Sequence, residues 1–205
     1  MRTDPIIKNS YYHIYNRGNQ TQQLFFDQSD YIRFLFGILL YQSDISLSHP
    51  SRQVGYFLKK KSFQVDADTI DAILNNRRVE LINFCVMPNH FHLLVRNVTE
   101  TGIPTYLHKV SNAYAKYFNT KYDRSGHVFQ GTYKANSLMN ENDVMRLSAY
   151  IHNNPKELNY KLEEYAWSSL IDFKQNRWGN LLERGIVRER FKSFKDYLSY
   201  IQTNG

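Results

Sequence analysis

The sequence predicts an α+β fold in which helices pack on one side of an antiparallel sheet. Two apolar stretches, residues 79–87 and 91–97, follow each other closely in the chain. Pro88 and Asn89, which favour a turn, lie where they join, as in a hairpin. Helical and extended patterns mix along the chain without the regular strand–helix repeat of a parallel sheet. Together these two observations favour an antiparallel sheet with helices packed on it.

The composition fits one ordinary domain with a real core. The chain has 205 residues, of which 42% are hydrophobic. The one cysteine, Cys85, excludes a disulfide within the chain, and its apolar neighbours indicate a small core residue. No apolar run approaches a membrane span, and the first residues lack the apolar core of a signal peptide. We therefore expect a soluble, cytoplasmic protein that does not enter the membrane.

Charge and aromatic content point toward nucleic acid. The formal net charge is +7, and 15% of the residues are aromatic, including sixteen tyrosines. A basic surface favours polyanions, and bases stack on aromatic rings, so the composition leans toward single-stranded nucleic acid. Many proteins that bind no DNA share these values, so composition alone leaves the question open.

The first part of the chain predicts a strand, two helices and an insertion. Residues 11–18 alternate weakly and end in Asn-Arg-Gly, a turn signal, which predicts a strand. Residues 29–42 are densely apolar after a Ser-Asp cap, which predicts a buried helix. Residues 43–63 are polar and basic, and we expect an exposed excursion there. Residues 66–76 combine Asp caps with helical spacing of the apolar residues.

The middle of the chain predicts the rest of the sheet and a long helix. Residues 79–87 and 91–97 read as two strands, and the Pro-Asn pair between them fits a turn or a bulge within a longer strand. Residues 103–123 carry apolar side chains at a 3.6-residue period, which predicts a long helix. Residues 127–136 resemble a strand with a glycine in its middle.

The last elements are a helix and a C-terminal extension. Residues 141–154 predict a helix that Pro155 stops, because the residue before a proline avoids the helical region. We place the main domain at residues 1–170, including the insertion at 43–63, and a helical extension at residues 171–205. A basic stretch at 190–202 is the helix candidate of that extension.

Two histidines within an apolar strand are the first candidate for chemistry. His90 and His92 are two residues apart, so both imidazoles point to the same face of the strand. Imidazole is the commonest metal ligand near neutral pH, so the pair makes half of a divalent-metal site. The same pattern also suits a packed, hydrogen-bonded pair without a metal. A structural zinc site is a third interpretation, but the sequence offers no cysteine partners for it.

Tyr150 and Asn154 are the second candidate. They are four residues apart in the helix, so they stack on one side of it, beside the apolar stripe. That stripe consists of Val144, Leu147, Ser148 and Ile151. An amide oxygen is a hard ligand that suits magnesium or manganese, and a phenol beside a metal is placed to attack phosphorus. By spacing alone, a core-edge tyrosine and an ordinary helix end are the favoured explanations of the two residues.

Three segments in this order carry a resemblance to a known family. They are CVMPNHFHLLV (85–95), HVFQGTYKA (127–135) and LSAYIHNNP (147–155). Together they resemble the single-tyrosine HUH transposases of insertion sequences, and most closely the REP-associated tyrosine transposases, which are tied to repetitive extragenic palindromes. YHIYNRG near the start and AWSS at 166–169 resemble that branch too, so the resemblance covers roughly residues 8–170.

The resemblance implies a fold, a reaction and a set of site residues. The fold is a ferredoxin-like antiparallel sheet with the histidines on a central strand. The reaction is metal-dependent cleavage and transfer of single-stranded DNA through a covalent 5′-phosphotyrosine on Tyr150. His90 and His92 would bind Mg²⁺ or Mn²⁺, with Asn154 as third ligand where relatives often have Gln. At 100° per residue His152 points about 200° away from Tyr150, so we expect no ligand there.

The resemblance also implies a DNA partner that forms hairpins, and a protein associated with the nucleoid. Candidate DNA contacts are Arg17, Lys59, Lys60, Lys61 and Lys134, although the lysine run at 59–61 is equally typical of a solvated loop. The alternative function is a catalytically silent DNA-hairpin binder or repressor on the same fold. The intact histidine pair and tyrosine favour the enzyme, and the sequence leaves monomer or dimer undecided.

Overall fold

The protein is built around one antiparallel sheet, as the computed structural model shows for residues 5–45, 50–60, 63 and 65–205. The strand order is β2-β3-β1-β4. The strands are β1 (Tyr11–Arg17), β2 (Val79–Met87), β3 (His90–Asn97) and β4 (Lys134–Leu138). With α1 after β1 and α4 after β3, the chain has the β-α-β-β-α-β order of ferredoxin-like folds. The predicted fold class is confirmed.

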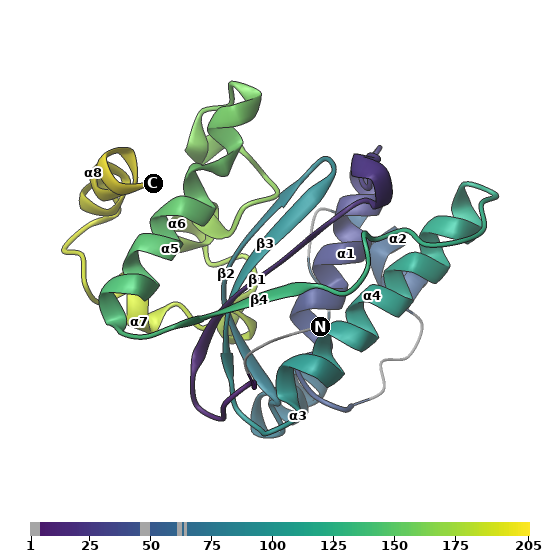
Figure 1. Cartoon of the computed structure of the whole chain (residues 1–205), viewed down its shortest axis with the longest axis horizontal. Coiled ribbons are helices and arrows are strands. Elements are labelled where there is room, and N and C mark those ends of the chain that lie inside the picture. The colour runs from purple at the N-terminus through teal and green to yellow at the C-terminus, as the bar shows by residue number, and fades with distance from the viewer. Residues whose placement is uncertain (1–4, 46–49, 61–62, 64) are drawn as a thin grey trace.

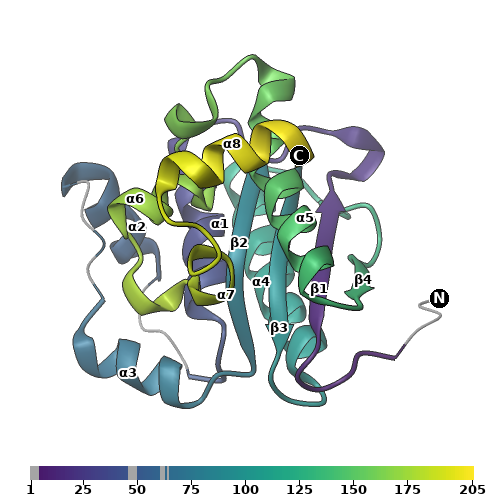
Figure 2. The same cartoon turned by 90° about the vertical axis from the view of Figure 1, so that its left-hand side faces the viewer.

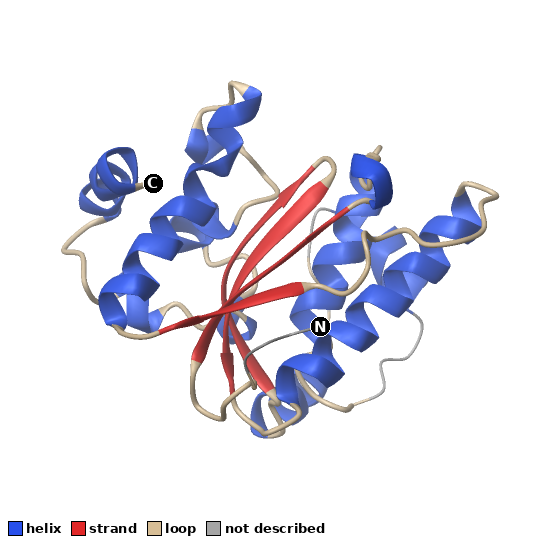
Figure 3. Cartoon of the chain, in the orientation of Figure 1, coloured by secondary structure: helices blue, strands red, loops and turns tan. Residues whose placement is uncertain are grey.

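Helices cover both faces of the sheet, so their predicted placement on one side is wrong (Figures 1 and 3). The α-helices are α1 (Gln28–Leu40), α2 (Pro50–Lys60), α3 (Ala67–Asn75), α4 (Gly102–Lys121), α5 (Glu141–Asn153), α6 (Asp172–Gln175), α7 (Gly185–Arg188) and α8 (Phe194–Asn204). Helices α1 and α4 lie on one face, and α5 lies on the other with α8 packed against it. Figure 2 looks onto this second face, with α8 and α5 in front of the strands.

Two apolar cores explain why both faces must be covered. Strands β2 and β3 are buried along nearly their whole length, including consecutive residues that point to opposite faces. Phe84 and Phe91 point into the core beneath α1 and α4, whereas Cys85 and Leu94 point into the core beneath α5. Cys85 is fully buried, which confirms its prediction as a core residue.

The β2–β3 hairpin is closed by a tight turn at Pro88 and Asn89, which settles the choice between a turn and a bulge. The loop after β1 is tied to this turn. The backbone N–H of Gly18 donates to Asn89 O over 2.8 Å, and that of Leu24 donates to Pro88 O over 2.8 Å. A Cβ atom at Gly18 would lie 2.1 Å from the carbonyl oxygen of Gln22, so only glycine fits there. These hydrogen bonds therefore fix the position of the turn, and with it the first residue of β3, His90.

The predicted strand at 127–136 is wrong in its first part. The chain is irregular before Lys134, and β4 pairs with β1 only from Lys134 to Leu138. Gly131 has a φ of 65°, a left-handed value that an extended strand does not accommodate. Instead, Gln130 is bonded to Arg17 through its side chain and its backbone N–H, so this segment closes the end of β1.

The predicted excursion at 43–63 is a packed helix along part of its length. Helix α2 packs on α1, and Val54 is buried in the core on that side. The Phe57 ring stacks on Trp178 at 5.8 Å between ring centroids, so the insertion contacts the C-terminal extension. One apolar face on a polar helix explains the difference, since such a segment looks polar in overall composition. Lys61 lies outside the described residues.

The C-terminal extension packs on both cores. Its side chains that join the core beneath α1 and α4 are Trp178, Leu181 and Leu182, and those that join the core beneath α5 include Val187, Tyr197 and Ile201. The segment just before it also completes the sheet edge, because the Val86 N–H donates to Trp167 O over 3.0 Å. Within the described parts of the chain, no helix is both long and apolar enough to span a bilayer.

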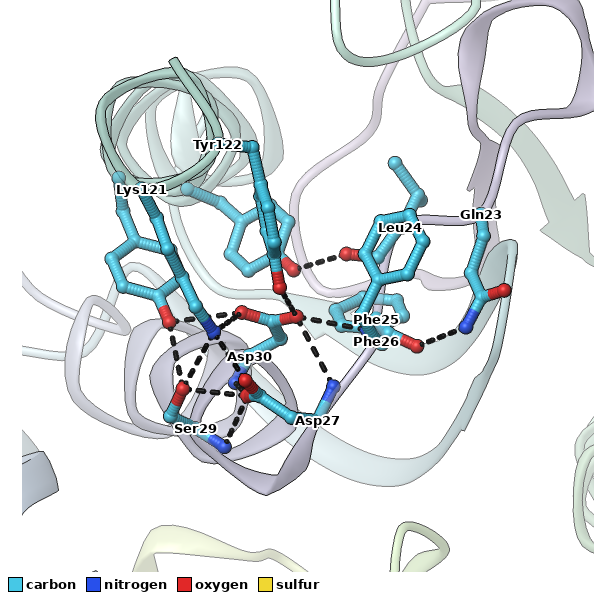
Figure 4. Close-up of polar contacts among 11 residues, drawn as sticks. Gln23, Leu24, Phe25, Phe26, Asp27, Ser29, Asp30, Lys121 and Tyr122 are labelled. Carbon is cyan, nitrogen blue, oxygen red and sulfur yellow. Dashed lines mark hydrogen bonds and ion pairs between the residues drawn. The ribbon is translucent and has the colours of Figure 1, made fainter. Parts of the chain in front are cut away.

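A buried carboxylate joins the start of α1 to the end of α4 (Figure 4). Asp30 is fully buried, and Lys121 Nζ lies 2.6 Å from its Oδ1. The hydroxyls of Tyr117 and Tyr122 donate to the same carboxylate over 2.9 and 2.6 Å, and the Phe26 N–H donates over 2.8 Å. Full hydrogen bonding of both oxygens is what makes burial of this charge tolerable.

Candidate active site

The histidine pair lies on the face of the sheet that α5 covers. His90 begins β3 directly after the hairpin turn, and His92 follows on the same face, with 5.1 Å between the ring centroids. His92 is 7% exposed and His90 is half-buried. In the sheet register Arg17 of β1 lies opposite His90, and Tyr15 lies opposite His92. The pair therefore sits on a central strand at the end of the hairpin.

Helix α5 brings Tyr150 against this pair. Asn140 caps the helix by accepting the Asp143 N–H over 3.0 Å, and the predicted apolar stripe is buried. With that stripe against the sheet, Tyr150 comes to the side of the helix, where its ring meets His92 edge-on at 5.4 Å between centroids. The side chain remains 45% exposed. The two candidates of the sequence thus lie side by side, and the Tyr150 ring is open to solvent.

Asn154 follows on the same side of the helix. Its Nδ2 donates to the Tyr150 carbonyl oxygen over 2.7 Å, while its Oδ1 is buried and has no hydrogen-bond partner. Helix α5 ends at Asn153, close to the predicted end, although Asn154 keeps the helical conformation that a residue before proline was expected to avoid. Proline instead occupies the start of a 3₁₀ turn, Asn154–Leu158, where its missing N–H costs nothing.

The residues present fit a divalent metal ion. A buried amide oxygen without a partner costs free energy unless something binds it, and a cation would do so. Within the described ranges, no cluster of three His, Cys, Asp or Glu side chains has metal-binding spacing. A centre at this place would therefore need the Asn154 oxygen beside His90 and His92, a set of nitrogen and hard oxygen donors that suits manganese or magnesium.

Burial keeps the histidines neutral, as metal ligands must be. It lowers the pKa of His92 from 6.5 to about 3, and the nearby His13 and His90 add to the effect. Burial also lowers the pKa of His90, although the Asn154 side chain and the charge of Glu157 oppose the shift. At neutral pH each ring therefore has one nitrogen that carries a lone pair and no proton.

Tyr150 is protonated in the protein without a metal. Burial raises the pKa of its hydroxyl above 10, and the negative charge of Glu157 adds to the rise. The nearby Asn154 side chain acts in the opposite direction and lowers this pKa. Nucleophilic attack needs the phenolate, so a positive charge beside the hydroxyl would favour the reactive form.

The structure adds His13 and Tyr15 to the site, and the sequence interpretation missed both. His13 Nε2 lies 2.9 Å from His92 Nδ1, and the Tyr15 ring packs on His92 at 5.8 Å between centroids. Burial lowers the pKa of His13 from 6.5 to about 4, so it too is neutral. The alternation of YHIYNRG places His13, Tyr15 and Arg17 on one face, which was the available signal.

His152 serves the fold and is not in the site. It is fully buried on the far side of α5, as its predicted direction implies. Its Nδ1 lies 2.7 Å from the Tyr197 hydroxyl of α8, and its Nε2 lies 2.7 Å from Ser169 Oγ. Ser169 also accepts the Phe84 N–H over 2.8 Å, so His152 links α5, α8 and the edge of β2. The AWSS and YIHNNP motifs thus share one buried network.

This network predicts a loss of stability in mild acid. Burial lowers the pKa of His152 from 6.5 to about 3, so between these values the unfolded chain binds a proton that the folded protein does not. The contribution to stability is complete above pH 6.5 and is lost as the pH falls toward 3. At pH 5 the loss is about 2 kcal/mol.

Urea unfolding of the wild type and His152→Gln at pH 7 and pH 5 measures this effect. Lowering the pH changes the contributions of all other titrating groups equally in the two proteins, so these contributions cancel in the comparison. The wild type should therefore lose about 2 kcal/mol more of its free energy of unfolding than the variant. Equal losses in the two proteins would show that His152 titrates normally in the folded state.

The predicted DNA contacts divide into two groups. Arg17 lies on the same face of β1 as His13, and Lys134 is exposed at the start of β4 opposite Tyr15. Lys59 and Lys60 are exposed at the end of α2, which packs on α1 across the sheet from the site (Figure 1). The structure thus brings Arg17 and Lys134 near the candidate site and leaves Lys59 and Lys60 on the other face.

Comparison with protein families gives the class to which this site is similar. Residues 55–154 match the model of the family described as "Transposase IS200 like". All four candidate site residues lie within that segment, and the match confirms the resemblance to insertion-sequence transposases. No sequence among curated proteins matches the chain.

Solved structures give a particular neighbour. The chain is similar to a REP-associated tyrosine transposase bound to a REP hairpin, with a TM-score of 0.54 and 13% identity over 90% of this chain and 91% of that one. A protein from Deinococcus radiodurans R1 described as a transposase matches at a TM-score of 0.36 and 16% identity, over 75% of this chain and 96% of that one. The first similarity shows a shared fold. The family match and this fold support a transposase role.

Proposed function

We propose that the protein cuts and rejoins single-stranded DNA, with Tyr150 as the nucleophile of a covalent protein–DNA intermediate. The observation that carries this proposal is the exposed Tyr150 ring packed edge-on against His92 at 5.4 Å, beside a buried amide oxygen without a partner. A tyrosine, two neutral imidazoles and an open side are the parts that such a reaction needs.

The chemical step follows from these parts. Tyr150 Oη would attack the scissile phosphorus, forming an O–P bond to the 5′ side while the bond from phosphorus to the 3′ oxygen breaks. The phenol proton passes to water, and the leaving 3′ oxygen takes one from water. Because the phosphotyrosine keeps a phosphodiester bond, the 3′-hydroxyl of another strand can reverse the step and join new ends.

His90, His92 and Asn154 would hold a divalent cation, either Mg²⁺ or Mn²⁺. The donor set and the unpartnered Asn154 Oδ1 support this assignment. Such an ion supplies charge that stabilises the phosphate in the transition state and favours the phenolate. Tyr150 itself is positioned by α5 and by its contact with His92.

The proposed partner is DNA with palindromes that form hairpins. The proposed location of the protein is the nucleoid. The solved neighbour with 13% identity binds a REP hairpin, and this chain has a formal net charge of +7. Arg17 and Lys134, which lie near the site, are the proposed contacts to the phosphate backbone.

A cleavage assay tests the proposal. End-labelled single-stranded DNA carrying REP-like hairpins is incubated with the purified protein and Mn²⁺ or Mg²⁺, with EDTA as the control. We expect a covalent protein–DNA band that survives denaturation and forms only with metal. A second unlabelled strand with a free 3′-hydroxyl should then convert the covalent product into a joined strand.

Tight hairpin binding without a covalent band, across several hairpin sequences and both metals, would contradict the enzyme. That outcome would favour a DNA-hairpin binder or repressor on the same fold. A covalent band that forms equally well in EDTA would contradict the metal centre alone.

A further inference from the structure

We infer that His13 is a positioning residue that holds the His92 imidazole in the tautomer and direction needed to bind a metal. The inference rests on the proposed function, because it concerns the metal centre proposed there. His13 lies in the YHIYNRG segment but received no role from the sequence, and the structure brings it to His92 from the neighbouring strand.

The sheet register makes this contact. Tyr15 of β1 lies opposite His92 of β3, and His13 lies opposite Leu94, so His13 is diagonal to His92 on the same face. The centroids of the two imidazole rings lie 5.1 Å apart, and the ring planes differ by only 28°, so the rings face each other nearly edge to edge. His13 Nε2 lies 2.9 Å from His92 Nδ1, which is hydrogen-bonding distance.

One proton lies between these two nitrogens, and its position decides whether His92 can be a ligand. If His13 Nε2 donated, His92 Nδ1 would accept and the single proton of neutral His92 would sit on its Nε2, so neither nitrogen could bind a cation. If His13 Nε2 accepts, His92 Nδ1 carries the proton and the Nε2 lone pair is free. A metal centre therefore requires His13 as the acceptor.

The other histidine of the pair is held in the same way. His90 Nδ1 lies 2.8 Å from Asn89 Oδ1, an acceptor in the hairpin turn. An amide oxygen only accepts, so His90 Nδ1 is the donor and its Nε2 is free. Each candidate ligand thus has its Nδ1 held by a neighbouring side chain, Asn89 for His90 and His13 for His92. This common arrangement is the second observation behind the inference.

The first measurement is the affinity for Mn²⁺ in the absence of DNA. The electron paramagnetic resonance signal of free Mn²⁺ reports how much of the ion is unbound. His13→Leu removes the acceptor, and we expect a dissociation constant about 10- to 100-fold higher than that of the wild type. His13→Gln keeps an acceptor oxygen and should recover most of the affinity. His108→Leu is the matched control, since it removes an exposed imidazole of α4, on the other face of the sheet, whose Nε2 lies 2.9 Å from Asn112 Nδ2.

The second measurement is the ¹⁵N spectrum of the histidine rings in the metal-free protein. Wild-type His92 should show the proton on Nδ1, and His13→Leu should shift the population toward the other tautomer. Thermal unfolding of each variant separates this effect from a general loss of structure, because a purely structural role would lower stability without changing the tautomer.

The outcomes separate this inference from the proposed function. Wild-type Mn²⁺ affinity in His13→Leu, together with lost affinity in His92→Ala, would overturn the role of His13 and leave the metal centre intact. A wild-type His92 with its proton on Nε2 would overturn it as well. If the wild type and His92→Ala bound Mn²⁺ equally, the metal centre itself would fail and the inference with it.

Discussion

Replacing Tyr150 with phenylalanine should abolish the covalent protein–DNA product and leave hairpin binding unchanged. The substitution removes only the attacking oxygen, and the ring can keep its contact with His92. The side chain is 45% exposed, so no buried hydroxyl is lost from the core. Loss of a nucleophile lowers the rate by about three orders of magnitude or more, which takes the band below detection.

Denaturing gels for the covalent band and native gels for binding measure the two effects on the same DNA. Tyr160→Phe is the matched control, because Tyr160 is a similarly exposed tyrosine that packs on Tyr165 and not on the histidines. It should form the covalent band as well as the wild type does. An undiminished band in Tyr150→Phe would assign the nucleophile to another residue.

The second large effect concerns stability, and it comes from Lys121→Met. This change removes the cation beside the fully buried Asp30 carboxylate, and we expect a loss of about 3 kcal/mol in the free energy of unfolding. Two tyrosine hydroxyls and the Phe26 N–H still bond to the carboxylate, which keeps the loss at the lower end of the usual range. Urea unfolding at pH 7 measures it.

Two further variants make this prediction specific. Lys161→Met breaks an exposed ion pair with Glu164 and should change stability by less than about 1 kcal/mol. The double variant Asp30→Asn/Lys121→Met should cost less than the sum of the single changes, because removing both groups leaves no buried carboxylate without its cation. Strictly additive losses would show that Lys121 and Asp30 do not interact energetically.

Local periodicity was enough to predict much of the fold and the candidate site. Side chains two apart in a strand share a face, so His90 and His92 could be paired from the sequence. Side chains four apart in a helix stack, so Tyr150 and Asn154 could be paired too, and the same angle excluded His152. The helix at α4 and the strands β2 and β3 were predicted almost to their ends. The roles of these site residues stay predictions.

The sequence by itself determined which residues share a face, because that depends only on the pitch of a helix or strand. Tertiary structure alone decided which faces meet. It set His13 beside His92 through the β1–β3 register, and it buried one face of α2 against α1. It also placed helices on both sides of the sheet and left the Asn154 oxygen unpartnered. These contacts join residues far apart in the chain, and no local period encodes the distance between them.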